Sequence, residues 1–248
     1  GSHPKMTGSL SADDLNRLLD EYGDRMIRPY VWARHAIAGD PDALMDSCCL
    51  TFDDGLRECL DVALPVLESR GLTAACLVPT APLVGMPLAM ERWRQVREAP
   101  DFYALWRRHL KFVTFDGKVT DYLSDRSYLS PDGRLFRHWR DRADAAVYER
   151  VMEALAANFP PVTTDRWLSA ADLRALRARG HVVGFHTHTH PMSLAKLTKE
   201  QQAAELATSK WILEQVLGEP VTTGAWPCGT FTDFAMQWCK DNGVTLMW

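Results

Sequence analysis

The sequence predicts an α/β fold of the (β/α)-barrel kind, with a parallel sheet of about six strands and a mostly helical insertion. Strand-like apolar runs alternate with helical patterns, and this order implies right-handed crossovers between parallel strands. Polar side chains directly follow several of the strands, as they do at the carboxyl ends of barrel strands. About six strands are too few for the usual barrel of about eight.

The first 80 residues are expected to contain two helices and three strands. Ser11 and Asp14 form an N-terminal cap ahead of leucines at helical spacing, and Gly23 ends this first helix. A second helix over residues 56–70 contains Pro65, which must kink it or remove one hydrogen bond. The predicted strands cover residues 27–32, 48–52 and 73–78.

Residues 81–165 are predicted to form a mostly helical insertion that covers the site and selects the substrate. Helical patterns occupy residues 90–99, 102–112 and 141–159, whereas residues 115–134 are rich in turn formers. Trp93, Trp106 and Trp139 lie in or beside these patterns. Aromatic residues at helical spacing favour a packed helical core over a stack of rings that binds sugar.

The last third of the chain alternates helix and strand again. Ser169 caps a helix that ends at Gly180, and Thr198 opens a capping box for a helix that runs to Gly218. The other predicted elements are a helix that begins at Thr230 or Thr232 and strands over residues 182–185, 221–226 and 244–248.

Composition narrows the classes of protein. A net charge of -4 gives no reason to expect a nucleic-acid or anionic-membrane partner, and no apolar run is long enough to predict a transmembrane helix. The six cysteines follow no zinc-finger or oxidoreductase spacing, which favours free, buried thiols in a reducing compartment. We therefore expect a cytoplasmic protein with a single domain over residues 1–248.

Two strand ends carry the candidate functional residues. Asp53 and Asp54 follow one strand-like run, and His186 and His190 follow another. Adjacent carboxylates repel each other, and a bound cation relieves that repulsion. One aspartate and two histidines form a ligand set that leaves positions open for water and substrate, as catalytic zinc or a similar ion requires. The second aspartate would then take a proton from that water. For residues 53–55 alone, an ordinary Asp-rich turn is the alternative.

Three motifs resemble those of the polysaccharide deacetylases, the NodB-type family of metal-dependent carbohydrate esterases. They are Thr51-Phe52-Asp53-Asp54-Gly55, then His186-Thr187-His188-Thr189-His190 behind the lead Gly180-His181-Val182-Val183-Gly184, and Trp226-Pro227-Cys228-Gly229. Their order, strand context and spacing agree with the family, over roughly residues 46–80 and 165–248. The resemblance implies an incomplete, distorted barrel.

Carried over by position, the resemblance implies that Asp54, His186 and His190 bind one divalent metal. Zn²⁺ is the first choice, and Co²⁺, Mn²⁺, Ni²⁺ and Fe²⁺ are alternatives. Asp53 would be the general base, and the backbone N–H of Cys228 would stabilise the oxyanion. The supporting residues would be Thr187, whose hydroxyl orients neighbouring groups or caps the turn, and Trp226, Pro227 and Gly229.

The sequence departs from the family pattern at the arginine and at the acid. Ala225 stands where the family has an arginine that supports the catalytic aspartate. The family's C-terminal Leu-x-His motif, which supplies the acid for the leaving amine, has no counterpart. His188 and Asp233 are candidates for that acid, and metal-bound water or an inactive protein are the alternatives. Because His188 is flanked by two ligands, its side chain is expected to point away from them into solvent.

The predicted function is a divalent-metal-dependent deacylase that removes an N-acetyl group, or another small acyl group such as formyl, from an amino sugar. A nucleotide-linked or lipid-linked precursor in polysaccharide or glycoconjugate biosynthesis is the favoured substrate. The alternative is a catalytically silent metal-binding domain that recognises a carbohydrate or a partner protein.

Overall fold

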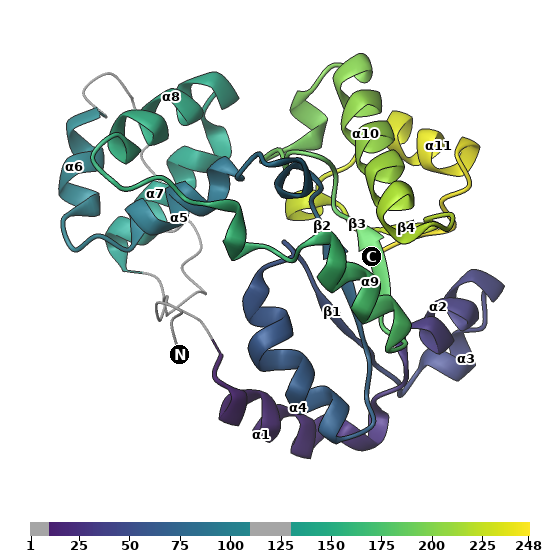
Figure 1. Cartoon of the computed structure of the whole chain (residues 1–248). Helices are drawn as coiled ribbons and strands as arrows, with labels where there is room; N and C mark the ends of the chain where they lie inside the picture. Colours follow the sequence, from purple (N-terminus) through teal and green to yellow (C-terminus); the bar gives the residue numbers. More distant parts are fainter. Residues whose placement is uncertain (1–9, 110–129) are drawn as a thin grey trace. The chain divides into compact units, whose positions relative to one another are not determined.

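The computed structural model describes residues 10–109 and 130–248, which divide into two compact units (Figure 1). One unit is Gly1–Leu88 with Thr163–Trp248, and the other is Ala89–Val162. In the described residues of the first unit, a five-stranded parallel sheet has its strands in chain order. The strands are β1 (Leu50–Phe52), β2 (Ala74–Val78), β3 (Val182–Phe185), β4 (Thr223–Gly224) and β5 (Leu246–Met247). The predicted incomplete barrel is confirmed.

The central strands fix the edge at which the candidate residues meet. Every residue of β2 is buried, as expected for a parallel strand covered on both faces. Leu50 of β1 pairs with Ala74, and Ala75 pairs with Val182 of β3. Because all the strands run in the same direction, the segments that follow them emerge at the same edge of the sheet.

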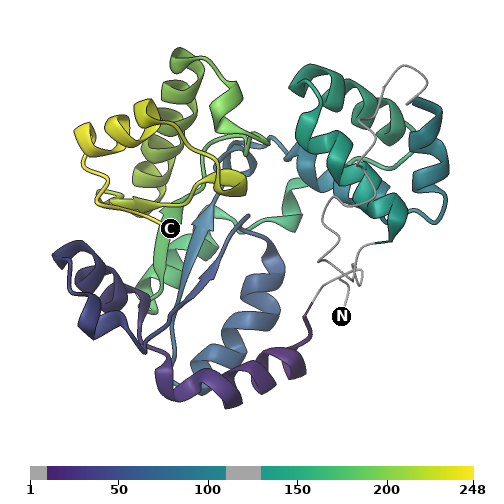
Figure 2. The ribbon, with the colours of Figure 1, turned by 180° about the vertical axis from the view of Figure 1, so that it is seen from behind.

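Helices of the first unit pack on the sheet through leucines. In Figures 1 and 2, α1 and α4 lie beside β1, whereas α10 and α11 lie toward β3 and β4. One core joins α1, α4, α9 and α10 to the strands through Leu19, Leu64, Leu173, Leu206 and Phe185. The helices are α1 (Ala12–Tyr22), α2 (Pro29–Ala38), α3 (Pro41–Leu44), α4 (Leu64–Ser69), α9 (Ala170–Ala178), α10 (Lys199–Leu217) and α11 (Asp233–Asp241).

The predicted strand over residues 27–32 is wrong, because α2 begins at Pro29. Proline suits the first turn of a helix, where its missing N–H would have no partner in any case. Arg28 before it is extended, and Gly39 ends α2 with a φ of 67°. The expected strand is reduced to one parallel bridge between Met26 and Cys48. The tyrosine, valine and tryptophan of this run are therefore helical despite their preference for strands.

Most of the other local signals are confirmed. Ser11, Ser169 and Thr198 each form the expected capping box. The helix over residues 56–70 is interrupted as Pro65 requires, with a π-helical segment at Cys59–Ala63 ahead of α4. The strands after residue 220 are shorter than predicted, since β4 and β5 have two residues each.

The second unit is helical in its described residues. Its helices are α5 (Ala89–Arg97), α6 (Phe102–His109), α7 (Pro131–Arg142) and α8 (Ala145–Ala156). Residues 110–112 of the predicted second helix and residues 115–129 of the predicted turn-rich segment lie outside the described residues. The prediction of turns over residues 131–134 is wrong, because Ser130 caps α7 there. Asp144 caps α8, so the pattern over residues 141–159 contains the end of one helix and the whole of another.

Trp93, Trp106 and Trp139 belong to the core of this second unit, as the helical spacing predicts. Their exposed fractions are 5%, 0% and 3%. The ring centroids of Trp106 and Trp139 are 5.7 Å apart, and the indole of Trp93 donates a hydrogen bond to Glu153. That this unit covers the site and selects the substrate, and that the chain is a single domain with an insertion at about 81–165, stay predictions.

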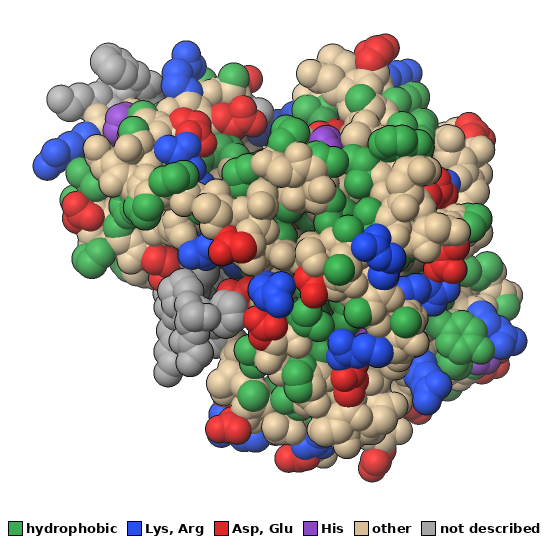
Figure 3. Space-filling view, in the orientation of Figure 1, with side chains coloured by type: hydrophobic (Ala, Val, Ile, Leu, Met, Phe, Trp, Pro, Cys, Tyr) green, Lys and Arg blue, Asp and Glu red, His purple; other side chains and the backbone are tan. Residues whose placement is uncertain are grey.

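The surface carries charges of both signs. On the face that Figure 3 shows, acidic and basic side chains are interspersed. Among residues 10–109 and 130–248, no helix has both the length and the apolar composition needed to cross a bilayer.

Candidate metal centre

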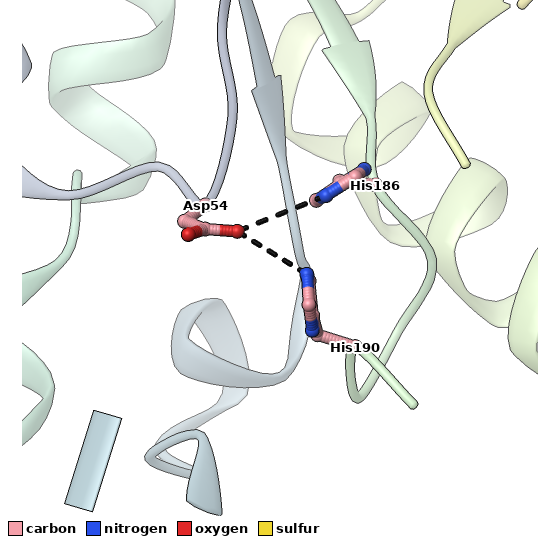
Figure 4. Close-up of side chains that lie close together, drawn as sticks. All are labelled: Asp54, His186 and His190. Carbon is pink, nitrogen blue, oxygen red and sulfur yellow. Dashed lines mark ion pairs between the residues drawn. The ribbon is translucent and has the colours of Figure 1, made fainter. Parts of the chain in front are cut away.

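Three predicted ligands converge at the carboxyl edge of the sheet (Figure 4). Asp54 follows β1, and His186 and His190 follow β3. The Oδ1 atom of Asp54 lies 3.2 Å from Nε2 of His190 and 3.7 Å from Nε2 of His186. Ligand atoms bound to one tetrahedral zinc ion are about 3.4 Å apart, given bonds of about 2.1 Å. All three donor atoms lie within 4.8 Å of one another, so these side chains could together hold a single divalent cation.

The loops of the site have an unusual backbone conformation. In the described part of the chain, the non-glycine residues with positive φ are Asp54 (69°), Thr187 (60°), His190 (56°) and Cys228 (54°). This region is sparsely populated and is especially unfavourable for a β-branched residue such as Thr187. Each such residue costs on the order of 1–3 kcal/mol, and strain of this kind clusters at functional sites. All four lie in the three predicted motifs.

The orientation of His186 is fixed by the backbone of the third motif. Its Nδ1 atom lies 3.0 Å from the carbonyl oxygen of Ala225, so Nδ1–H donates and Nε2 keeps its lone pair toward Asp54. Burial lowers the pKa of His186, His190 lowers it further, and Asp53 and Asp54 oppose this effect. Both imidazoles are largely buried, with exposed fractions of 2% for His186 and 7% for His190. A neutral imidazole is the form that binds a metal.

Asp53 remains open to solvent beside this cluster. Partial burial of its carboxyl group raises the pKa, and the charge of Asp54 adds to the rise, while His186 and His190 act against it. Asp53 is next in sequence to the proposed ligand Asp54 but is not one of the clustered side chains. It therefore stays the candidate for the general base. A raised pKa makes its carboxylate a better proton acceptor.

The remaining residues of the second motif do not behave as expected. Thr187 is fully buried, and its hydroxyl has no hydrogen-bond partner among the described residues, so neither an orienting nor a capping contact of this hydroxyl is seen there. His188 is half-buried rather than exposed, and its Nδ1 atom is 3.0 Å from Oγ1 of Thr80. Nδ1 of His190 is buried and likewise has no partner in the part of the chain that is described.

Residues of the third motif form the loop after β4. Pro227 is buried, Cys228 is exposed, and Trp226 packs against Phe231 with ring centroids 5.6 Å apart. Gly229 has a φ of 65°. Asp233, the other candidate acid, is exposed at the first residue of α11 and is not part of the clustered ligand set.

Sequence reasoning missed the residues that hold the histidine loop. Thr80 follows β2, and Glu205 and Ser209 lie on α10. Each of them makes hydrogen bonds to residues 187–189. The spacing of four residues between Glu205 and Ser209 places them on one face of the helix. The sequence could have shown from this spacing that the two side chains share a face of the helix. It could not have shown which loop that face contacts.

The first unit has a cavity of about 810 Å³ that is lined in part by Arg57 and Glu58, which follow the aspartate loop in the sequence. One wall is attached to the aspartate loop, because the N–H of Leu168 donates to the carbonyl oxygen of Gly55 over 2.8 Å. Its other wall includes Leu83 of the segment after β2. The lining residues are Arg57, Glu58, Asp61, Pro82, Leu83 and residues 163–170. The cavity is large enough for a sugar ring and has polar groups to bind hydroxyls.

Comparison with known proteins gives one family match and several solved structures of similar fold. The family model of polysaccharide deacetylase matches residues 141–247. A search of curated proteins finds no match. The solved structure of the deacetylase PplD of Streptococcus pyogenes, in complex with acetate, shares 14% identity over 98% of this chain and 77% of that chain, with a TM-score of 0.57.

Two further solved structures have the same fold. IcaB from Ammonifex degensii has 16% identity over 99% of this chain and 78% of that chain, with a TM-score of 0.59. A de-N-acetylase from Aggregatibacter actinomycetemcomitans has 13% identity over 99% of this chain and 80% of that chain, with a TM-score of 0.58. The family match and the shared fold confirm that this chain resembles the polysaccharide deacetylases, as its motifs predict.

Proposed function

We propose that this protein is a divalent-metal-dependent hydrolase that removes an N-acetyl group, or another small acyl group such as formyl, from an amino sugar. The observation that carries the proposal is the convergence of Asp54, His186 and His190, with Asp53 beside them. The family match over residues 141–247 supports deacetylase chemistry. Acetate, bound in the structure of PplD, is the product that hydrolysis of an N-acetyl group would release.

The donor set suits a borderline cation. Oδ1 of Asp54 and Nε2 of each histidine would hold it, and two nitrogen ligands with one oxygen favour Zn²⁺, with Co²⁺, Mn²⁺, Ni²⁺ or Fe²⁺ as alternatives. When bound, the ion would supply positive charge that polarises the acyl carbonyl and makes water more acidic. Burial lowers the pKa of His186, which favours the neutral form that binds a metal.

The residues of this chain would then perform three tasks. Asp53 takes a proton from the attacking water, whose oxygen forms a bond to the acyl carbon. The backbone N–H of Cys228 stabilises the oxyanion. The carbon–nitrogen bond breaks, and an acid returns a proton to the amine, so that the products are the amino sugar and a carboxylate. His188 and Asp233 are the candidates for this acid.

The substrate we favour is a nucleotide-linked or lipid-linked amino sugar from polysaccharide or glycoconjugate biosynthesis. The cavity beside the aspartate loop would hold the part of the substrate next to the acylated sugar. Cytoplasmic localisation is part of the proposal, because Cys59 and Cys76 are buried with sulfur atoms 3.9 Å apart and yet are free thiols.

A catalytically silent metal-binding domain is the second candidate. It is favoured by Ala225, which replaces an arginine of the family pattern. Such a domain would bind a metal and recognise a carbohydrate or a partner protein without releasing acetate or another carboxylate.

Acetate release separates the two candidates. Protein purified without a nickel column would be assayed for metal content, and then for acetate or formate release from acylated amino sugars, with Asp53→Asn as the matched variant. Product formation by the wild type and its loss in Asp53→Asn would support the hydrolase. Stoichiometric metal with sugar binding but no product from any acylated sugar tested would favour the silent domain.

A further inference from the structure

Glu205 of α10 accepts three hydrogen bonds from the loop between the two histidine ligands. Its Oε2 atom accepts the backbone N–H groups of His188 and Thr189, both at 2.8 Å. Its Oε1 atom accepts the hydroxyl of Thr189 at 2.5 Å. Both carboxylate oxygens are thus used within two consecutive residues of the loop. Hydrogen bonds to an ionised acceptor are shorter and stronger than those between neutral groups.

Ser209, one helical turn further along α10, binds the preceding residue of the same loop. Its hydroxyl donates to the carbonyl oxygen of Thr187 over 2.7 Å, and Ser209 and Thr187 are both fully buried. Residues four apart in a helix lie on the same face. One face of α10 therefore contacts three consecutive residues, 187–189, between His186 and His190.

The opposite side of the loop is attached to the segment that follows β2. The N–H of Ala81 donates to the carbonyl oxygen of His188 over 3.0 Å, and the N–H of Thr80 donates to that of Thr187 over 3.3 Å. The hydroxyl of Thr80 is also within 3.0 Å of Nδ1 of His188. The loop is consequently held from two sides.

Attachment from two sides can hold the loop in an unfavourable backbone conformation. Thr187 and His190 have φ angles of 60° and 56°, which isolated residues of these types rarely adopt. A conformation of this kind persists only where the surroundings determine it. Without the attachments we expect the loop to relax, which would move the two imidazoles out of the cluster whose donor atoms lie within 4.8 Å of one another.

We propose that Glu205, assisted by Ser209, is a positioning residue for the metal centre: it holds the loop in the strained conformation that presents both imidazoles to one cation. This inference rests on the metal site of the proposed function. Glu205 is not in the clustered ligand set, so it acts through its hydrogen bonds to His188 and Thr189 of the loop. It would lower the cost of ordering the ligands before the ion binds.

The test compares four proteins in the metal-free form: wild type, Glu205→Gln, Glu205→Ala and Glu200→Gln. Glu200 is the matched control, because it is an exposed carboxylate in the first turn of the same helix. Each protein is titrated with Co²⁺, followed by the visible absorption of the bound ion, and then with Zn²⁺ in competition. Thermal unfolding of the metal-free proteins shows whether each variant is folded.

We expect metal affinity to fall further in the variant that loses more of the hydrogen bonds to the loop. Loss of a partner outside the ligand set typically costs about tenfold to a hundredfold in metal affinity, and we expect Glu205→Ala to fall in that range. Glu205→Gln retains one carbonyl acceptor without the charge and should lose about threefold to tenfold. The Co²⁺ spectrum of both variants should change in intensity, which reports altered ligand geometry rather than lower stability. Glu200→Gln should match the wild type.

Two outcomes would overturn the inference, and they can be told apart. If the wild type binds Co²⁺ and folded Glu205→Ala binds it with the same affinity and spectrum, the positioning role is wrong while the proposed metal site stands. If the wild type binds neither Co²⁺ nor Zn²⁺, the metal site itself is wrong, and the positioning role falls with it. Where Glu205→Ala does not fold, the decision rests on Glu205→Gln and Ser209→Ala.

Discussion

The Nδ1 nitrogen of His186 donates a hydrogen bond of 3.0 Å to the carbonyl oxygen of Ala225. Ala225 is the position at which the family pattern has an arginine, so that side chain is absent here, but the main chain orients His186, a proposed metal ligand. We predict that His186 in the metal-free protein has its proton on Nδ1 at neutral pH. Nitrogen-15 NMR of the imidazole measures this directly. A proton on Nε2 of His186 would contradict the assignment. So would a mixture of the two tautomers like that of a histidine held by no such bond, for which exposed His109 is the reference.

Removal of a single ligand should remove the metal. Asp54→Ala and His190→Ala each delete one of three clustered donors, and a two-donor site binds divalent ions far more weakly. We expect about one ion per chain in the wild type, by plasma mass spectrometry, and little in either variant. His109→Ala, at an exposed histidine, serves as the control. Equal metal content in all four proteins would show that the ion, if any, is bound elsewhere.

Asp53→Asn should abolish turnover without releasing the metal. The amide has nearly the shape of the carboxylate but cannot accept the proton of the attacking water, and loss of a general base costs about 10²- to 10⁴-fold in rate. Acetate release measures the rate, and metal content is determined on the same sample. A variant that keeps full activity would show that another group is the base.

Stability in acid should depend on Glu68. Burial acts to raise the pKa of its carboxyl group, but hydrogen bonds from His181 and Arg179 outweigh burial and leave the pKa below its ordinary value. A depressed carboxyl pKa stabilises the fold above the unfolded-state pKa, and this contribution is lost as the pH falls through the folded-state pKa. The wild type should therefore exceed Glu68→Gln in stability at neutral pH.

This advantage of the wild type over Glu68→Gln should shrink below about pH 4, near the ordinary pKa of glutamate. Urea unfolding across pH measures it. Glu219→Gln, which alters the exposed ion pair with Arg177, is the control and should show a smaller dependence. A Glu68→Gln curve parallel to the wild type at every pH would rule out this ionic contribution.

Gly184→Ala should destabilise the sheet beneath the metal centre. A Cβ atom at Gly184 would lie 2.7 Å from both Cδ2 of Leu77 and the carbonyl oxygen of Thr223. Overpacking of this kind costs about 1–3 kcal/mol. Gly23→Ala is the matched control, because its φ is -57° and nothing lies within 4 Å of the added atom. Urea midpoints that fall equally in both variants would contradict the close approach.

Local signals in the sequence predicted much of the fold correctly. Capping residues such as Ser11 and Thr198 act through bonds to neighbours three residues away, so the pattern alone contains the information. The run over residues 27–32 misled because strand preference and the helix-start signal of Pro29 conflict there, and the helix-start signal prevails. The prediction of turns over residues 131–134 failed because Pro131 and Gly133 are typical turn residues. Here Ser130 caps the segment, and the same residues form the first turn of α7.

By itself, the sequence determined that two aspartates and two histidines follow strands, and parallel strands bring their carboxyl ends to one edge. The meeting of these residues at one edge follows from the common direction of the strands, and it can be predicted without knowing the distances between the side chains. Only the tertiary structure decided which imidazole nitrogen faces Asp54, because the carbonyl of Ala225 comes from the residue that follows β4, 39 residues away. Likewise, Glu205 reaches the histidine loop only because α10 packs against β3. Contacts between distant segments leave no periodic pattern in a sequence, whereas the order of strands and helices does.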